Sequence, residues 1–392
     1  MNSKMANVFE NNELRRYSRQ LVLPEFNING QKKLKQSSVL VVGAGGLGSP
    51  TLLYLVAAGV GTIGIVDSDI VDLSNLQRQV IYNVADVGQK KAFVAAKKLK
   101  SFNPFVNCIS YDTFLTNDNA LDIIKEYDLI IDGTDNFSAR YLINDACVLL
   151  GKPFIYGSIY QFEGQVSVFN YKTKKIPKPP CYRCLYTNPP PPNLVPNCSE
   201  GGVLGVLPGI IGSMQANEAI KVLAEIGEPL VGRLFIFDAL TFTNQIIEYE
   251  NNRSCALCGD MPTIKELQDY NFFCMMNDSK MDASKEVTVK TLKKKLDDGI
   301  DFQLIDVREP FEIELVSIGG ELISFGVVEN DLDSVISKIR VNKDVIFYCR
   351  DGKRSKAMIS MLEKQYGLSN LYNLRGGIQE WILKIDPSLP YY

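Results

Sequence analysis

Four of the nine cysteines in this sequence could hold a metal ion together. They form two C-x-x-C pairs, Cys181 with Cys184 and Cys255 with Cys258, separated by about seventy residues. Four thiolates suit a tetrahedral zinc ion whose positions are all filled, which is a structural site. The alternatives are four unrelated cysteines or a redox pair, but neither pair follows a thioredoxin-like strand. The spacing therefore predicts structural Zn²⁺.

A further cysteine, Cys349, is placed for nucleophilic chemistry. It follows an apolar run at Asp344–Tyr348 and precedes a helical pattern over Ser355–Tyr366, so it lies on a strand-to-helix turn. A thiol there meets backbone amides, the positive end of a helix and the cations Arg350 and Arg354. All three stabilise a thiolate. We expect a reactive Cys349, and an inert cysteine is the alternative.

The chain contains no histidine. This absence excludes Ser-His-Asp and Cys-His catalysis and any histidine-ligated metal. Acid–base or nucleophilic chemistry must therefore use Cys, Lys, Asp, Glu, Arg or Tyr. The N-terminus lacks the apolar segment of a signal peptide, so metal and thiol chemistry are better expectations than disulfides.

The stretch Ser38–Asp69 has the pattern of a nucleotide-binding site. A predicted strand at Val39–Val42 leads into a glycine turn, a helix at Pro50–Ala58 and a second strand at Thr62–Val66 that ends on Asp67. Glycines let backbone amides approach a phosphate, and a helix N-terminus favours its negative charge. The acid can bind a ribose hydroxyl. The turn contains four glycines, Gly43, Gly45, Gly46 and Gly48.

This stretch has two other interpretations. No charged residue occurs between Gln36 and Val66, which could indicate a membrane span. The glycines and the polar turn argue against a span, and buried parallel strands are almost continuously apolar. An NAD site is the second alternative, because G-x-G-x-x-G alone does not identify the nucleotide.

Charged residues near the turn favour a triphosphate with Mg²⁺. Arg78 and Lys91 follow the second strand, and Asp135 stands at the end of a predicted strand over Tyr127–Gly133. A lone Lys or Arg is usually a surface charge, but here two cations accompany two acids and a glycine loop. Ligands of open α/β sheets bind at the carboxyl ends of the strands, so Asp135, Asp67 and the turn should converge on one crevice.

Six motifs resemble the ubiquitin-activating-like adenylyltransferases of the MoeB/ThiF type, which activate sulfur-carrier proteins. They occur in order over residues 14–259: RYSRQ, GAGGLGS, DSD, NLQRQ, GQKK and GTDN. The resemblance implies that the nucleotide is ATP and that Asp67 holds its ribose. It also implies that Arg78 and Lys91 bind the phosphates. Asp135 would hold magnesium.

The same resemblance implies further site residues. The DSD and NLQRQ motifs add Asp69 and Asn75 to the ATP site. The arginine that matches Arg19 reaches the phosphates of the partner subunit in that family, which implies a homodimer. Cys198 resembles the loop cysteine that forms a thioester or an acyl disulfide in sulfur-carrier activators, although a lone cysteine is more often buried core. Family members also carry the same cysteine knuckle.

The C-terminal part resembles a rhodanese sulfurtransferase domain over about residues 285–388. The resemblance rests on C-R-x-G-x-R at Cys349, on DVRE upstream and on GGIQEW downstream. It implies that Cys349 carries a persulfide in a loop that includes Arg350 and Arg354.

The predicted fold is α/β. A Rossmann-like ATP-binding domain with a zinc knuckle should span residues 1–260, a linker 261–285 and a smaller α/β rhodanese domain 286–392. The combined resemblance is to the molybdopterin-synthase adenylyltransferase/sulfurtransferases. It implies adenylation of a ubiquitin-like sulfur carrier on its C-terminal Gly-Gly, then sulfur transfer to give a thiocarboxylate. The alternatives are a conjugating enzyme that passes a carrier thioester from Cys198, and a non-catalytic scaffold.

Charge and composition limit the partners. The net charge of −3 and the pI of about 5.4 argue against nucleic acid as a partner. With no predicted anchor or signal peptide, we expect a cytoplasmic protein. A cysteine desulfurase is a candidate sulfur donor. The carrier could serve molybdopterin, thiamine or tRNA thiolation, between which the sequence does not decide.

Overall fold

The computed structural model describes residues 8–188, 202–268, 270, 285–328 and 332–392. The chain forms two compact units, Met1–Asn277 and Asp278–Tyr392. Most of the expected linker, including residues 271–284, lies outside the described residues, so its boundaries stay a prediction.

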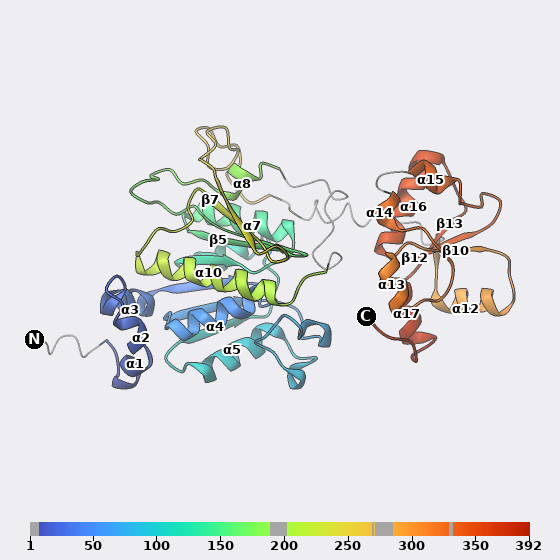
Figure 1. The fold of residues 1–392 in the computed structure, drawn as a ribbon. Helices are drawn as coiled ribbons and strands as arrows, with labels where there is room; N and C mark the ends of the chain where they lie inside the picture. Colours follow the sequence, from blue (N-terminus) through green and yellow to red (C-terminus); the bar gives the residue numbers. More distant parts are fainter. Residues whose placement is uncertain (1–7, 189–201, 269, 271–284, 329–331) are drawn as a thin grey trace, which may run out of the picture. The chain divides into compact units, whose positions relative to one another are not determined.

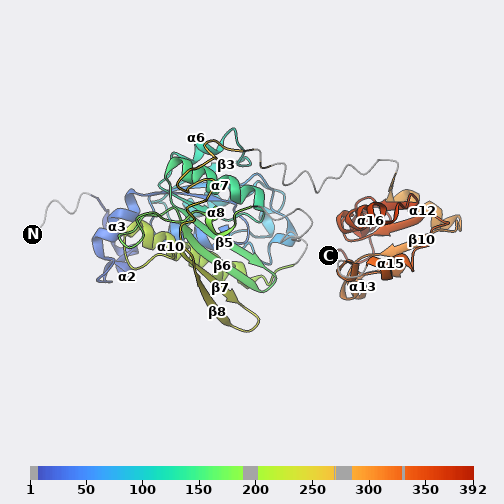
Figure 2. The same cartoon turned by 90° about the horizontal axis from the view of Figure 1, so that it is seen from above.

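The first unit is built on an eight-stranded sheet of order β3-β2-β1-β4-β5-β6-β7-β8 (Figure 1). The first five strands in this order pair in parallel and the others antiparallel. Figure 2 shows β6, β7 and β8 following β5 as one continuous sheet. The strands are β1 Ser38–Val42, β2 Thr62–Val66, β3 Asn107–Tyr111, β4 Leu129–Asp132, β5 Phe154–Tyr160, β6 Glu163–Phe169, β7 Arg233–Asp238 and β8 Thr243–Glu248.

Helices cover both faces of this sheet, as expected for a Rossmann-like domain. One apolar core packs under α3 Asn27–Gln36, α4 Gly48–Ala58, α5 Lys91–Phe102 and α10 Val206–Ala224. The core on the opposite face packs under α6 Ala120–Ile124, α7 Phe137–Leu150 and α8 Tyr182–Leu185. The predicted strand–turn–helix–strand unit of residues 38–69 is confirmed, with the helix beginning two residues earlier than expected.

The charged segment Glu13–Gln20 does not form one continuous helix. It falls in two short helices, α1 Asn11–Arg16 and α2 Ser18–Leu21, which meet at Tyr17. Tyr17 is buried and its hydroxyl accepts a 2.9 Å hydrogen bond from Asn103 Nδ2. This long-range contact fixes the break, which local charge patterning does not predict.

The second unit holds a parallel five-stranded sheet of order β11-β10-β12-β13-β9. The strands are β9 Glu286–Val287, β10 Gln303–Asp306, β11 Glu321–Leu322, β12 Val345–Tyr348 and β13 Leu371–Leu374. The helices are α12 Val289–Asp297, α13 Pro310–Leu315, α14 Phe325–Val328, α15 Leu332–Ile336, α16 Lys353–Tyr366 and α17 Gly377–Lys384.

The alternation of side chains along β12 sets the direction of the reactive thiol. Ile346 and Tyr348 belong to the core on the α12 and α17 face, with Trp381. Phe347 and Cys349 belong to the opposite core, which α15 and α16 cover. Because side chains of a strand alternate between faces, Cys349 points toward the start of α16.

Candidate active sites and metal centre

The glycine turn brings the end of β1 against the end of β4. Gly43 has φ +94°, and a Cβ atom there would lie 2.6 Å from the carbonyl oxygen of Gly133. A Cβ on Gly48 would lie 2.0 Å from the oxygen of Gly43. Only glycine fits these two positions. The absence of side chains there leaves the backbone of the turn accessible beside the N-terminus of α4.

Asp67 stands at the end of β2 and contacts the turn. Its Oδ2 accepts a 2.8 Å hydrogen bond from the Ala44 amide, and its Oδ1 accepts one of 2.9 Å from the Asp69 amide. Burial raises the pKa of Asp67, while the charge of Lys91 and these two donors oppose the rise. The carboxylate is thus half-buried and held beside the glycine backbone.

The two predicted cations lie in different surroundings. Lys91 is buried, and its Nζ lies 2.9 Å from Asp69 Oδ2. Arg78 donates to the Ser74 carbonyl at 3.2 Å. Burial lowers the pKa of Arg78, and the charge of Asp135 opposes this shift, so these two groups are within electrostatic reach.

The structure thus brings Asp67, Asp69 and Lys91 together beside the turn, with Asp135 acting on Arg78. Asn75 ends the short helix Leu73–Asn75. Its Oδ1 accepts from the Asp72 amide at 3.4 Å. The roles of these residues toward a nucleotide stay predictions.

Two residues of this region escaped the sequence reasoning. Gln79 is buried, and its Oε1 has no hydrogen-bond partner among the described residues. A Cβ at Gly45 would lie 3.6 Å from Gln79 Nε2, so this amide borders the turn. Tyr82 donates to the Ala44 carbonyl at 3.0 Å and supports the turn from behind. Gln79 lies in the NLQRQ motif, so its position in that motif could have indicated a role at this site. An orphaned polar atom beside open glycine backbone fits a polar ligand such as a nucleotide.

Two predicted catalytic residues have no described site around them. Arg19 is exposed on α2. Cys198 lies outside the described residues. Their expected roles stay predictions.

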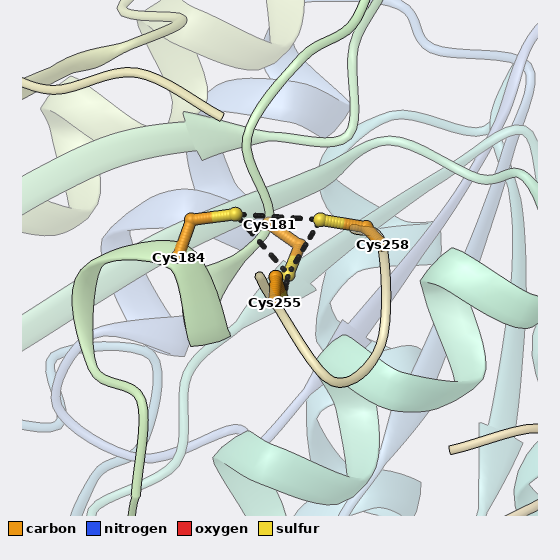
Figure 3. Close-up of side chains that lie close together, drawn as sticks. All are labelled: Cys181, Cys184, Cys255 and Cys258. Carbon is orange, nitrogen blue, oxygen red and sulfur yellow. Dashed lines mark hydrogen bonds between the residues drawn. The ribbon is translucent and has the colours of Figure 1, made fainter. Parts of the chain in front are cut away.

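The four paired cysteines converge from two chain segments (Figure 3). Their Sγ atoms lie within 4.8 Å of one another. Cys181 Sγ is 3.9 Å from Cys184 Sγ and 3.7 Å from Cys255 Sγ, and Cys258 Sγ is 3.3 Å from both Cys181 and Cys184. A tetrahedral zinc ion with Zn–S bonds of about 2.3 Å separates its sulfurs by about 3.8 Å. The donor set and spacing therefore fit zinc.

Backbone and side-chain amides surround this cysteine cluster. Asn251 Nδ2 lies 3.3 Å from Cys258 Sγ, and the Asn252 amide donates to Cys184 Sγ at 3.4 Å. Such donors partly neutralise thiolate charge and orient metal ligands. Cys181 and Cys255 are buried with Leu257, which also favours a structural rather than an open catalytic site.

Cys349 lies at the predicted strand-to-helix turn. The Gly352 amide donates to its Sγ at 3.1 Å, and Ser355 Oγ lies 3.5 Å from the same atom. Asp351 Oδ1 is 3.8 Å from Sγ. The thiol itself is fully buried. A persulfide would extend the reactive sulfur beyond Sγ by one S–S bond of about 2.0 Å.

The two loop arginines contact groups other than the thiol. Both Nη atoms of Arg354 donate to Glu312, at 2.6 and 2.7 Å. The guanidinium of Arg350 lies 5.6 Å from the centroid of the Tyr392 ring. Sequence reasoning did not find Glu312 or Tyr392. Glu312 follows the DVRE motif by three residues, which was a weak signal for it.

The GGIQEW motif packs directly against this loop. Gly376 and Gly377 have φ +73° and +57°, and a Cβ on Gly377 would lie 2.4 Å from the Cys349 carbonyl oxygen. The amides of Ile378 and Gln379 donate to the carbonyls of Cys349 and Arg350, at 2.9 and 3.0 Å. The start of α17 therefore holds the loop carbonyls away from the sulfur.

Comparison with known families agrees with both units. Residues 17–257 match the ThiF family and residues 288–384 match the rhodanese-like domain. The chain belongs to the ThiF family. The predicted MoeB/ThiF and rhodanese resemblances are therefore confirmed.

Two of the relatives that this chain matches align with nearly its whole length. A probable adenylyltransferase/sulfurtransferase MoeZ of Mycobacterium tuberculosis is 45% identical over 99% of this chain and 97% of its own. Adenylyltransferase and sulfurtransferase MOCS3 of Aedes aegypti is 39% identical over 98% of this chain and 90% of its own. A sulfur carrier protein adenylyltransferase of Thermus thermophilus is 54% identical over 67% of this chain and 97% of its own. Because all three relatives are named as adenylyltransferases, two of them also as sulfurtransferases, this chain is an enzyme.

Solved structures agree on the fold. E. coli MccB matches with a TM-score of 0.56 and 20% identity over 67% of this ThiF family chain and 77% of that chain. PaaA matches with a TM-score of 0.55 and 23% identity over 64% and 78%, respectively. None of the helices in the described part of the chain has both the length and the apolarity needed to cross a bilayer.

Proposed function

We propose that this enzyme adenylates the C-terminal glycine of a ubiquitin-like sulfur carrier and then converts that carboxylate to a thiocarboxylate. The observation that carries the proposal is that one chain holds both a glycine turn flanked by buried Lys91 and a loop whose donors surround Cys349 Sγ. The names of its full-length relatives combine the same two activities.

The first step would take place at the glycine turn. The amides of Gly43–Gly48 and the start of α4 would bind phosphate, and Asp67 would hold the ribose. Arg78 and Lys91 would bind the phosphate oxygens, with Asp69 and Asn75 keeping these groups in place. The carrier carboxylate attacks the α-phosphate and pyrophosphate leaves, which gives an acyl adenylate. Asp135 would hold Mg²⁺, which shields the phosphate charge when bound.

The second step would use the Cys349 loop. A donor persulfide or thiosulfate gives its outer sulfur to the Cys349 thiolate. The terminal sulfur of the resulting persulfide attacks the acyl adenylate and AMP leaves, which forms an acyl disulfide. A second thiol then attacks the Cys349 sulfur of that disulfide and releases the thiocarboxylate. We assign this resolving role to Cys198, and an external thiol would reduce the disulfide left behind.

Other parts of the proposal concern cofactors and partners. The cysteine cluster would hold Zn²⁺ as a structural ion, because its spacing and filled donor set suit that metal. Exposed Arg19 would reach the ATP phosphates of a second subunit in a homodimer. A cytoplasmic cysteine desulfurase would supply sulfur. Molybdopterin synthesis is the pathway that we propose first for the carrier.

Two assays on the full-length chain separate the steps. Carrier-dependent ATP–pyrophosphate exchange reports adenylation, and thiosulfate:cyanide sulfurtransfer reports the Cys349 loop. Cys349→Ala should abolish sulfurtransfer and retain exchange, whereas Asp135→Ala should do the reverse. Cys198→Ala should retain both partial activities and lower only thiocarboxylate formation. Cys108→Ala and Asp118→Ala are matched controls outside the two sites.

The outcomes decide between the proposal and its alternatives. Carrier thioester on Cys198 with full thiocarboxylate yield in Cys349→Ala would favour a conjugating enzyme. Absence of exchange with every Gly-Gly carrier tested, in protein that binds ATP, would contradict the substrate class. A wild-type chain without either activity would favour a scaffold.

A further inference from the structure

A chain of buried polar side chains runs beneath the reactive thiol. Cys349 Sγ lies 3.5 Å from Ser355 Oγ, which in turn lies 2.6 Å from Asn373 Oδ1. Ser355 and Asn373 are both fully buried. Ser355 belongs to α16 and Asn373 to β13, so the chain links the thiol to the neighbouring strand.

One atom in this chain is left without a partner. Asn373 Nδ2 is buried and makes no hydrogen bond within the described part of the chain. In this arrangement the Ser355 hydroxyl donates its only proton to Asn373 Oδ1. The hydroxyl then offers lone pairs to Cys349 Sγ. That arrangement suits a protonated thiol, which can donate, and does not suit an anionic sulfur.

Rotation of the Asn373 amide by half a turn reverses the direction of donation. The oxygen and nitrogen of an amide have nearly the same shape, so both orientations fit one cavity. In the rotated form Nδ2 donates to Ser355 Oγ, and the hydroxyl proton is free to donate to Cys349 Sγ. The atom left unpaired is then a carbonyl oxygen, which buried sites tolerate better than an unpaired N–H.

The charged groups around the thiol make this donation important. Asp351 Oδ1, 3.8 Å from Sγ, is repulsive toward an anionic sulfur. The cation Arg354 attracts it, but both its Nη atoms already donate to Glu312, which offsets that charge. The groups that can donate directly to Sγ are therefore the Gly352 amide and, in the rotated form of Asn373, the Ser355 hydroxyl.

We propose that Asn373 is a positioning residue for sulfur transfer, whose amide directs the Ser355 hydroxyl toward the anionic sulfur of Cys349. Ser355 touches the reacting atom and acts as a catalytic donor to the thiolate and to the persulfide. This inference rests on the proposed sulfurtransferase function of the loop. It extends that function from the loop to β13.

The test compares Ser355→Ala, Asn373→Leu and the double variant in the full-length chain. Leucine is close to asparagine in volume but carries no hydrogen-bond donor, so the Ser355 hydroxyl would lose the amide that directs it toward the sulfur. Thiosulfate:cyanide kcat should fall about tenfold or more in each variant, since hydrogen bonds to charged groups contribute at this level. KM for thiosulfate should stay unchanged. The double variant should be no slower than Ser355→Ala, because Asn373 acts through Ser355.

A second measurement does not depend on turnover. The alkylation rate of Cys349 by iodoacetamide, followed on its own peptide by mass spectrometry, should rise at higher pH in both single variants than in wild type. Asn370→Ala is the matched control. It removes an amide near the start of the same strand, and that amide donates to backbone carbonyls of Arg340 and Lys343. Its alkylation profile should match wild type.

Folding is checked with Trp381, the single tryptophan of the sequence, which is buried in the second unit. If Asn373→Leu loses the folded fluorescence signal, Asn373→Ala replaces it in the same comparison. Additive losses in the double variant, or an Asn373 variant with the kcat and alkylation profile of Asn370→Ala, would overturn the inference. A wild-type chain inactive toward thiosulfate would contradict the proposed function instead, and the alkylation profiles would still test the hydrogen-bond chain.

Discussion

Arg354 and Glu312 form a two-pronged ion pair, with Nη1–Oε2 at 2.6 Å and Nη2–Oε1 at 2.7 Å. Glu312 also accepts from the Tyr392 hydroxyl at 3.1 Å and from the Glu309 amide at 2.9 Å. Because both side chains are largely buried, removal of one partner leaves an uncompensated charge beside the Cys349 loop.

This pair makes the second unit sensitive to acid. Burial would raise the pKa of Glu312, but hydrogen bonds from Arg354 and Glu309 outweigh burial and lower it below its ordinary 4.5. A lowered folded-state pKa gives stability that is present above the unfolded value and lost as the pH falls through the folded one. The urea midpoint of Trp381 fluorescence should therefore fall below about pH 4.5.

Glu312→Gln should remove this part of the acid dependence and destabilise the second unit by about 1–3 kcal/mol at pH 7. Glu314→Gln, on the exposed side of the same helix, is the matched control and should behave like wild type. Equal midpoints for the two variants at pH 7 would show that the ion pair adds no stability.

We predict one zinc ion per chain in protein purified without chelator. Cys181→Ser should lose the metal and destabilise the first unit, because metal bound by folded ligands contributes directly to folding. Thiosulfate:cyanide sulfurtransfer should stay unchanged. Cys108→Ser is the matched control and should retain full metal content by elemental analysis. A stoichiometric metal content in Cys181→Ser would contradict the assignment of this ligand.

Lys91 and Lys90 offer a comparison between neighbours. Lys91 is buried and paired with Asp69, whereas Lys90 is exposed and lies 3.3 Å from Asp112. Lys91→Met should reduce carrier-dependent pyrophosphate exchange at least tenfold, since a charge-assisted contact to phosphate is lost. Lys90→Met should change it less than twofold, as expected of a surface ion pair. Similar rates in the two variants would remove Lys91 from the site.

A comparison of the adjacent residues Tyr391 and Tyr392 tests whether the Tyr392 hydroxyl stabilises the second unit. Tyr392 OH bonds to Glu312 and to Arg308, whereas Tyr391 is exposed. Tyr392→Phe should lower the Trp381 unfolding midpoint by the equivalent of about 1 kcal/mol. Tyr391→Phe should leave it unchanged. Equal midpoints would mean that the hydroxyl is not needed for stability.

Local patterns in the sequence were enough to predict the glycine turn and the Cys349 turn. In both cases an apolar strand, a short polar turn and a helix are consecutive in sequence, so spacing alone indicates the geometry. The cysteine pairs are a similar case, because two C-x-x-C motifs constrain each other although they are far apart. The family resemblances rest on motifs of this local kind.

Residues that reach a site from another element were missed. Glu312 comes from α13 and Asn373 from β13, and only the folded sheet brings them to the Cys349 loop. The break between α1 and α2 has the same origin, since Tyr17 packs on Gly59 and bonds to Asn103. Propensity and charge patterns do not contain such tertiary contacts.

The cysteine cluster also bears on chemical selectivity among thiols. An enzyme that passes sulfur between cysteines must prevent persulfides from forming elsewhere. Burial raises the pKa of Cys108 to about 11 and raises that of Cys147 as well, so both stay protonated and unreactive at neutral pH. A metal ion bound by the four clustered thiolates would also make these cysteines unreactive toward sulfur donors. Among the described cysteines, Cys349 is then left as the thiol with an amide and a hydroxyl beside its sulfur that can stabilise an anionic form.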